Sequence, residues 1–335
     1  MVSLFKTKST SAVVWITLLC IFVHLPFIFE GPQIILSTNS TLLDKLLSNL
    51  SDKSGTALFL VYLIIISLQA NRLNAAANNL SLFPKENALP GMVYVLFTAL
   101  LPQWNNISST LIINTLFIEI LASFRLLYTL EKKGRLMFNL SLVCGIASIL
   151  YPPTAIWVLV LFFALVFLGS FSPRLAIVWI VGLLLPFYFL AAYLFLNNYF
   201  QKDHILLLQK YMPQIAVHNL SLQGPPLLYL VAFGFILLTV LLGILNGMQN
   251  SGKLVTIARK VWGLCTLAFV LTVGNAFLLP DASLQILQLS IVPAALLGAC
   301  TFYYSNAKWL VNVWFWLITL GIYYTSLHTL HIIRF

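Results

Sequence analysis

Long apolar runs separated by short polar stretches make up most of this sequence, and they predict a series of membrane-spanning helices. A helix that crosses the bilayer core needs roughly 20 mostly apolar residues. The runs predict about eleven spans, at residues 11–29, 55–70, 89–103, 109–130, 136–151, 153–170, 175–196, 225–246, 261–279, 285–303 and 309–329. Because the runs are continuous and do not alternate over about ten residues, an outer-membrane barrel is excluded.

The composition agrees with this pattern. Of 335 residues, 61% are hydrophobic and 8% are charged, whereas about a quarter of the residues of a soluble domain are charged. The sequence therefore predicts an all-α, polytopic transmembrane helical bundle that forms one domain over residues 1–335. Near its middle, Tyr151-Pro152-Pro153 predicts a tight turn between two short spans, because proline lacks an amide donor and restricts the preceding residue.

The positions of lysine and arginine set the predicted orientation. With the N-terminus in the cytoplasm, 13 of the 18 basic residues fall on the cytoplasmic side, in keeping with the positive-inside rule. The odd number of spans then puts the C-terminus in the periplasm of a bacterial inner membrane. The net charge of +10 follows from this topology. No run of five basic residues occurs, so no nucleic-acid partner is predicted.

Titratable groups gather on the predicted outer side. They are five acids and all five histidines: Glu30, Asp44, Asp52, Asp203, Asp281, His24, His204, His218, His328 and His331. Any chemistry would therefore face outward, toward membrane lipid. The alternative is that these loops contain only the polar residues that any loop needs, because the positive-inside rule restricts lysine and arginine alone.

Two outer loops carry amphipathic patterns. In the first, five leucines at helical spacing form a stripe opposite three polar residues: Leu42, Leu43, Leu46, Leu47 and Leu50 against Asp44, Lys45 and Ser48. The fourth outer loop, residues 197–224, has a similar pattern. Such helices lie in the headgroup plane of a membrane. Loops that fold over the bundle and cap it would show the same pattern.

Glu119 is the one acidic residue inside a predicted span. It shares a helical face with Thr115 and Ser123, and this face is predicted to point into the bundle because a carboxylate that faces lipid is costly. Glu119 is a functional candidate by default; the alternative is a hydrogen-bonded side chain that joins two helices. The other polar residues in spans are predicted to link helices by hydrogen bonds: Asn275, Gln285, Gln288 and Asn312.

Motifs with a known chemistry are absent. The sequence has no P-loop, GxGxxG, HExxH or GxSxG, which excludes ATP-driven transport within this chain and common hydrolase chemistry. Its four cysteines lie in apolar runs without CxxC spacing and predict buried thiols. His328 and His331 share a helical face, but an isolated HxxH pair is typical of interfacial polar groups. No metal and no cofactor is predicted.

Residues 71–196 resemble a known family. The resemblance rests on Asn71-Arg72-Leu73-Asn74, Ala99-Leu-Leu-Pro102, Phe138-Asn139, Gly145-Ile-Ala-Ser-Ile-Leu-Tyr151-Pro152 and Gly182-Leu-Leu-Leu-Pro186-Phe187. These segments are similar to an uncharacterised family of bacterial polytopic inner-membrane proteins, some members of which are labelled membrane beta-carotene monooxygenases. The motifs are structural, so the resemblance implies a family without a reaction.

The arrangement resembles, more distantly, the GT-C type of integral-membrane glycosyltransferases, which use polyprenyl-phosphate sugars. This resemblance implies a shared module at residues 1–196, an outer loop at 197–224 and C-terminal helices at 225–335. In those enzymes a catalytic acid follows the first span and precedes interfacial helices. Glu30 has this position here. The analogy is one of topology.

Three functional hypotheses follow. In the first, Glu30 is the general base of a glycosyl transfer from a polyprenyl-phosphate-linked sugar at the outer leaflet. Cationic groups would stabilise the leaving phosphate, and the candidate substrate-binding residues are His24, Lys202, His204, Lys210, His218, His328 and His331. In the second, the protein is a non-enzymatic transporter or a membrane subunit of an envelope complex, with Glu119 in proton coupling or packing. In the third, His24, His328 and His331 hold iron, although their spacing matches no derivable site.

Overall fold

The fold was obtained as a computed structural model, which describes residues 1–7, 10–28, 32–34, 42–48, 55–131, 133–169, 171–196, 226–278, 284–305 and 307–329. Its α-helices are α1 (Thr10–His24), α2 (Leu42–Ser48), α3 (Gly55–Asn79), α4 (Leu89–Leu100), α5 (Ser109–Ala122), α6 (Phe124–Thr129), α7 (Gly134–Leu150), α8 (Ile156–Phe167), α9 (Pro173–Leu196), α11 (Pro226–Asn250), α12 (Thr256–Leu278), α13 (Leu284–Leu287), α14 (Ile291–Tyr304) and α15 (Lys308–Thr329). Short 3₁₀ helices lie at Val2–Phe5, Leu25–Ile28, Pro102–Trp104, Pro152–Ala155, Ser251–Lys253 and Gln288–Ser290. Within these ranges there is no strand, only a parallel bridge between Ile34 and Ile107.

Eight helical segments of the described part are long and apolar enough to cross a membrane: Ser11–Ile28, Gly55–Asn79, Ser109–Thr129, Pro173–Leu196, Leu228–Lys253, Thr256–Leu278, Leu284–Tyr304 and Trp309–His328. Three further apolar helices are shorter: Leu89–Leu100, Gly134–Leu150 and Pro152–Phe167. The all-α bundle and the multi-pass membrane class are therefore confirmed. The count of about eleven spans is not, because three of the predicted segments form helices too short to qualify on length.

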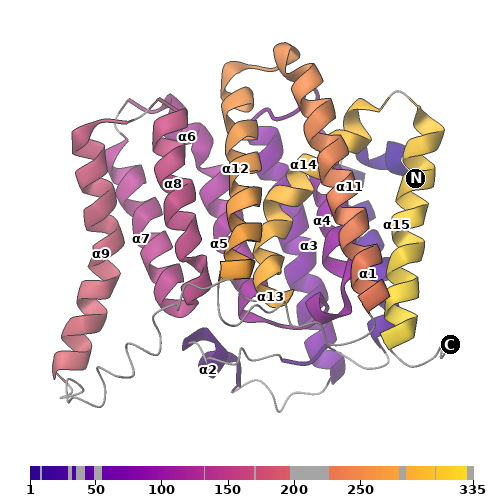
Figure 1. Cartoon of the computed structure of the whole chain (residues 1–335), viewed down its shortest axis with the longest axis horizontal. Coiled ribbons are helices and arrows are strands. Elements are labelled where there is room, and N and C mark those ends of the chain that lie inside the picture. Colours follow the sequence, from indigo (N-terminus) through magenta and orange to yellow (C-terminus); the bar gives the residue numbers. More distant parts are fainter. Residues whose placement is uncertain are drawn as a thin grey trace.

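The long helices lie side by side and alternate in direction (Figure 1). At the upper end in that view, the Ala88 amide donates a hydrogen bond to the Phe5 carbonyl, and the Lys85 amide donates one to the Tyr303 hydroxyl. At the lower end, Trp104 donates its indole N–H to the Leu284 carbonyl at 2.7 Å. The bundle therefore has two distinct ends, each joined by bonds between segments far apart in sequence.

Two helices form the centre of the bundle. Every residue of α4 is buried, and eleven of the fourteen residues of α14 are buried as well. α4 contacts α1, α3, α14 and α15, while α14 also contacts α11 and α12. The apolar character of α4 on all sides explains this position, because a helix without a polar face is stable only where other helices or lipid surround it.

A second group of helices, α7, α8 and α9, lies on one side of the bundle, at the left of Figure 1. The predicted turn between α7 and α8 is confirmed: Tyr151 is extended, and a 3₁₀ helix at Pro152–Ala155 leads into α8. α9 packs closely on α7. Gly182 is the only residue of α9 that is buried within the described part of that helix.

The charged side chains of the described residues are unequally divided between the two ends. The connections between α3 and α4, α8 and α9, and α11 and α12 lie at the upper end in Figure 1, and their sequences contain Lys85, Arg174 and Lys253. This segregation agrees with the charge asymmetry that the sequence shows along its loops. The assignment of the upper end to the cytoplasm stays a prediction.

Candidate functional site

Six of the residues that the sequence proposes for a site lie outside the described residues: Glu30, Lys202, His204, Lys210, His218 and His331. The proposed helix in the fourth outer loop lies there as well. The described candidates are His24, Glu119 and His328. In the described part of the chain, no three side chains of the metal-binding types come together.

His24 ends α1 and is fully buried at the lower end of the bundle. Its Nδ1 lies 2.8 Å from the Cys20 carbonyl oxygen, which requires a hydrogen on Nδ1 because a carbonyl only accepts. Its Nε2 lies 3.2 Å from the Tyr62 hydroxyl. Both ring nitrogens therefore have partners inside the protein, and the imidazole has no exposed edge through which it would reach a substrate in this conformation.

Tyr62 extends the contacts of His24 to the connection between α4 and α5. Its hydroxyl lies 3.1 Å from Asn105 Oδ1 and 3.4 Å from the Trp104 carbonyl oxygen. A neutral imidazole with its hydrogen on Nδ1 accepts at Nε2, so the Tyr62 O–H has three competing acceptors, on His24, Trp104 and Asn105. These residues are buried, and they tie α1 and α3 to the 3₁₀ turn at the lower end.

Gln288 joins the same end of the bundle to the C-terminal helices. Its Oε1 accepts a hydrogen bond of 3.0 Å from the Ser108 hydroxyl, and its carbonyl accepts one of 3.0 Å from Asn114 Nδ2. The prediction that Gln288 links helices is confirmed. It is also confirmed for Asn275, which donates to the Pro153 carbonyl, and for Asn312, which accepts from the Val2 amide.

α2 is the helix predicted in the first outer loop, but its buried and exposed faces differ from the predicted leucine and polar faces. Asp44 is buried together with Leu43 and Leu47, whereas Leu42 and Leu46 are exposed. The Ser109 hydroxyl donates to Asp44 Oδ1 at 2.5 Å. A hydrogen bond to α5 thus compensates for burial of the carboxylate, and α2 both caps the bundle and presents two leucines outward.

Glu119 forms an ion pair with Arg72. Arg72 donates from Nε to Oε1 at 2.5 Å and from Nη2 to Oε2 at 2.7 Å, which is the two-pronged geometry that guanidinium and carboxylate favour. The two side chains remain 49% and 44% exposed. The prediction that Glu119 points into the bundle is therefore wrong: its charge is paired across α3 and α5, on the outer surface of the protein.

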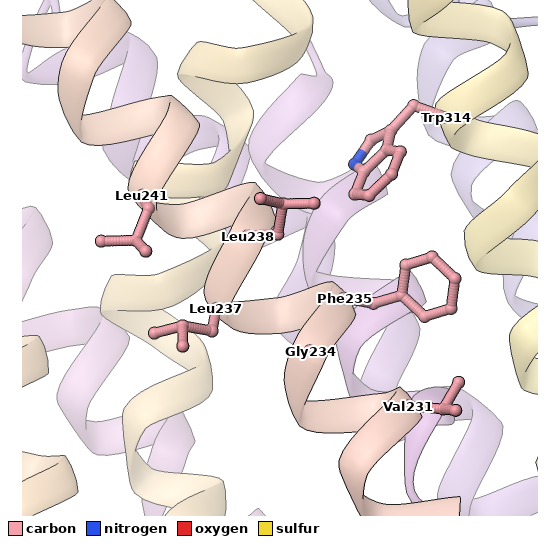
Figure 2. A pocket seen from close by; sticks show the side chains of 7 residues that line it. All are labelled: Val231, Gly234, Phe235, Leu237, Leu238, Leu241 and Trp314. Carbon is pink, nitrogen blue, oxygen red and sulfur yellow. The ribbon is translucent and has the colours of Figure 1, made fainter.

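An apolar groove lies between α11 and α15. It has a volume of about 460 Å³ and is lined by Val231, Gly234, Phe235, Leu237, Leu238, Leu241 and Trp314. Figure 2 shows Phe235 and Trp314 on the same side of α11. The Trp314 indole N–H donates to Thr239 Oγ1 at 3.0 Å, so the groove offers apolar contact but no reactive group.

His328 lies in the last turn of α15 and is partly buried, with its ring 6.3 Å from that of Tyr324.

Comparison of the chain with protein-family models, with curated proteins and with solved structures found no match. Among the described residues, the Arg72–Glu119 pair is the feature that ordinary packing in lipid accounts for least.

Sequence reasoning missed Arg72 as the partner of Glu119. The second predicted span ended at residue 70, which placed Arg72 in a cytoplasmic loop. The structure continues α3 to Asn79, so Arg72 lies on the helix and faces α5. The sequence does contain a signal for the longer helix. Ala75, Ala76 and Ala77 follow Arg72 and strongly favour a helix, but they add little to the hydropathy from which a span is predicted.

Proposed function

We propose that this protein is a membrane-embedded subunit of a larger assembly, and that the surface of α3 and α5 around Arg72 and Glu119 binds a transmembrane helix of a different protein. One observation carries the proposal: a charged pair is about half exposed on a surface that lies within two candidate membrane spans. Exposed leucines on this protein need no partner, because lipid surrounds them. An ion pair that is exposed on the same surface does need a partner.

The pair lies away from the ends of the two candidate spans. Arg72 lies seven residues before the end of α3, or about 10 Å of helix rise. Glu119 lies ten residues from each end of Ser109–Thr129, or about 15 Å. A charged side chain at the centre of a membrane helix costs about 2.5–3.5 kcal/mol. Pairing reduces this cost without removing it, since the outer edge of the pair still faces the surroundings.

The hydrogen-bonding capacity of Arg72 indicates what a partner must supply. A guanidinium has five N–H donors, and Arg72 uses two of them on Glu119 within the described part of the chain. In hydrocarbon, each donor without an acceptor costs several kcal/mol. The flanking surface is apolar, with Ile64 and Leu68 exposed on α3. A helix with an acceptor side chain at its centre and small or apolar residues around it would satisfy both requirements.

The proposal predicts site-specific crosslinking that depends on the ion pair. A photo-crosslinking amino acid at Thr115, which is exposed beside the pair, should give one adduct of defined mass in intact membranes. The same probe at Leu184 on α9, also exposed, is the position control. Arg72→Gln should remove the Thr115 adduct because the partner's acceptor loses its donor.

The matched control for charge is Arg259→Gln, since Arg259 is exposed and its guanidinium donates to Thr256 in its own helix. This variant should leave the Thr115 adduct intact. Thr115 crosslinks that are absent in the wild type, or unchanged by Arg72→Gln, would refute the proposal. An adduct of twice the mass of this chain would replace the foreign subunit by a second copy and would also refute it.

We propose glycosyl transfer at the outer leaflet, with Glu30 as general base, as a second candidate. The observation that favours it concerns the neighbours of Glu30 in sequence. The Gln33 amide donates to Asn106 Oδ1 at 2.8 Å, and the Gln33 carbonyl accepts from the Ile107 amide at 3.1 Å. Residues 32–34 are thus attached to the end of the bundle where α2 presents its exposed leucines.

The test of this candidate is Glu30→Gln in membranes supplied with a polyprenyl-phosphate-linked sugar. Loss of a general base lowers such a rate by about 10²–10⁴-fold, so transfer should fall by at least this lower figure. Glu131→Gln, at the predicted cytoplasmic end, should leave the rate unchanged. Equal rates in the wild type and Glu30→Gln would remove Glu30 from the mechanism.

A further inference from the structure

A cluster of buried polar side chains lies at the lower end of the bundle, where α5 begins beside the break between α13 and α14 (Figure 1). Its members are Ser108, Thr110, Asn114 and Gln288, and each is at most 1% exposed. Polar atoms buried in an apolar bundle are costly unless hydrogen bonds or a ligand satisfy them. The donors and acceptors of these four side chains therefore show whether the cluster needs a ligand.

Asn114 has an acceptor atom that no donor reaches. Its Nδ2 donates to the Gln288 carbonyl at 3.0 Å, which fixes the orientation of the amide because a carbonyl only accepts. Within the described part of the chain, no group donates to Asn114 Oδ1, although this atom is buried. A buried amide oxygen without a hydrogen bond is unfavourable. Asn114 Oδ1 therefore indicates a ligand that supplies a hydrogen or a positive charge.

The hydroxyl groups near Asn114 leave further acceptors over. Ser108 donates its one hydroxyl hydrogen to Gln288 Oε1 at 3.0 Å, because an amide oxygen only accepts. The Thr110 hydroxyl lies 3.2 Å from Ser108 Oγ and must therefore be the donor in that contact. Among the described residues, nothing else donates to Thr110 Oγ1 or to Gln288 Oε1. Oxygen lone pairs thus remain on three side chains.

The fold keeps these three side chains together. Thr110 and Asn114 are four residues apart on α5 and share one face of the helix. Gln288 is joined to the same stretch twice, through its side chain to Ser108 and through its carbonyl to Asn114. Gln288 also begins a 3₁₀ helix inside the candidate span Leu284–Tyr304. The left-over acceptors are therefore neutral oxygens at an interruption of a membrane helix.

A buried carboxylate lies next to the cluster. Ser109, between Ser108 and Thr110 in the sequence, donates to Asp44 Oδ1 at 2.5 Å, and Asp44 is 1% exposed. In a medium of low dielectric constant, a carboxylate attracts a cation beyond direct contact. A water molecule would satisfy the same acceptors but would gain little from this charge. Neutral oxygens beside one carboxylate suit a monovalent ion, since calcium sites contain several carboxylates.

We propose that Asn114 Oδ1, Thr110 Oγ1 and Gln288 Oε1 bind a monovalent metal cation, Na⁺ or K⁺, at the break between α13 and α14. Unwound segments of membrane helices coordinate Na⁺ in transporters, and carbonyl oxygens coordinate K⁺ in channels. The ion joins α5 to the segment that precedes α14, so it should stabilise the fold. The site does not include Arg72 or Glu119 and is independent of a partner helix at that pair.

The first experiment measures thermal unfolding of the purified full-length protein in detergent, with a thiol-reactive dye that reports exposure of the buried cysteines. NaCl and KCl are each titrated against N-methylglucamine chloride at constant ionic strength. At least one metal chloride should raise the unfolding temperature in a saturable way, because a ligand that binds only the folded state stabilises it. Equal unfolding temperatures in all three salts would overturn the proposal and leave a buried water as the occupant.

Variants locate the ion. Thr110→Val removes one oxygen with little change of shape, and the half-saturating concentration of the stabilising ion should rise by about tenfold, since a bond to a charged group is worth about that factor. Asn114→Leu should abolish the shift. The matched controls on α12 are Thr272→Val and Asn275→Leu, because each of these buried or partly buried side chains donates to a backbone carbonyl elsewhere. Both controls should keep the half-saturating concentration of the wild type.

A binding measurement on the folded protein completes the test. Equilibrium dialysis with radioactive sodium, or with rubidium where KCl is the stabilising salt, should show one displaceable ion per chain and weaker binding in Thr110→Val. Wild-type binding in both Thr110→Val and Asn114→Leu would overturn the site. Losses of the same size in Thr272→Val and Asn275→Leu would overturn it as well, because the effect would then report general loosening of the bundle.

Discussion

Gly243→Ala should destabilise the protein by about 3 kcal/mol, the upper part of the range for overpacked cores. A Cβ at Gly243 of α11 would clash with the carbonyl oxygen of Leu297 and would lie 2.8 Å from its carbonyl carbon. Both atoms belong to the backbone of α14, so no side chain can rotate to relieve the clash. The two helices would have to move apart at the centre of the bundle.

This close approach follows from the spacing of small residues. Gly243 and Gly247 lie four residues apart and face α14, where Cys300 Sγ would be 3.5 Å from a Cβ on Gly247. Small residues at this spacing let membrane helices approach until their backbones touch. Much of the contact between α11 and α14 therefore depends on the absence of one methyl group.

The matched control is Gly234→Ala on the same helix. A Cβ there would meet nothing within 4 Å, and alanine is a better helix former than glycine by about 1 kcal/mol. This variant should be as stable as the wild type or slightly more stable. The four cysteines are free and buried, so a thiol-reactive dye reports thermal unfolding of both variants. Similar unfolding temperatures for the two variants would contradict the predicted clash.

Gln69→Leu should cost about 2 kcal/mol, because the Gln69 amide joins three helices by hydrogen bonds, each of which contributes up to about 1.7 kcal/mol between membrane helices. Gln69 lies on α3 and is buried. Its Nε2 donates to the Leu111 carbonyl at 2.7 Å and to Thr115 Oγ1 at 2.8 Å on α5, and its Oε1 accepts from the Tyr94 hydroxyl of α4 at 2.7 Å. Leucine has a similar volume, so the loss reports hydrogen bonding more than packing.

A double-mutant cycle with Tyr94→Phe separates the contributions. If Gln69 and Tyr94 interact as described, the double variant should be less destabilised than the sum of the two single variants. Additive losses would show that the hydroxyl does not depend on Gln69. The thiol-reactive dye again provides the unfolding temperatures, since neither substitution touches a cysteine.

The helices could largely be predicted from the sequence, because hydropathy reports which segments prefer lipid to water. The turn at Tyr151 and the interhelical roles of Asn275 and Gln288 could be predicted too. The lengths of the helices were harder to predict from the sequence. The run at 89–103 looks like a span, but the helix stops at Leu100 and a 3₁₀ turn begins at Pro102.

The faces of helices could not be predicted from their apolar residues alone. The leucines of the first outer loop form one stripe on a helical wheel, yet Asp44 is buried because Ser109 of a distant helix donates to it. Glu119 was expected inside the bundle, yet Arg72 pairs with it on the surface. In both cases the decisive partner lies on another element, and one sequence does not show which elements meet.

The glycines in the resemblance motifs illustrate the same limit. Gly145 and Gly182 belong to those motifs, and the sequence alone gives no reason for glycine at either position. A Cβ at Gly145 would lie 2.7 Å from the Leu183 carbonyl oxygen, and one at Gly182 would lie 2.8 Å from the Phe138 carbonyl oxygen. The two residues let α7 and α9 touch, a relation between two segments that only the fold reveals.

The burial of α4 has a consequence for how the protein is made. Its twelve residues extend about 18 Å, well short of a bilayer core of about 30 Å, and all of them are enclosed by neighbouring helices. A segment this short cannot settle across the membrane alone as it leaves the translocon. Its contacts with α14 and α15 can form only once those helices have been synthesised, so the centre of the bundle is completed later than the first helices around it.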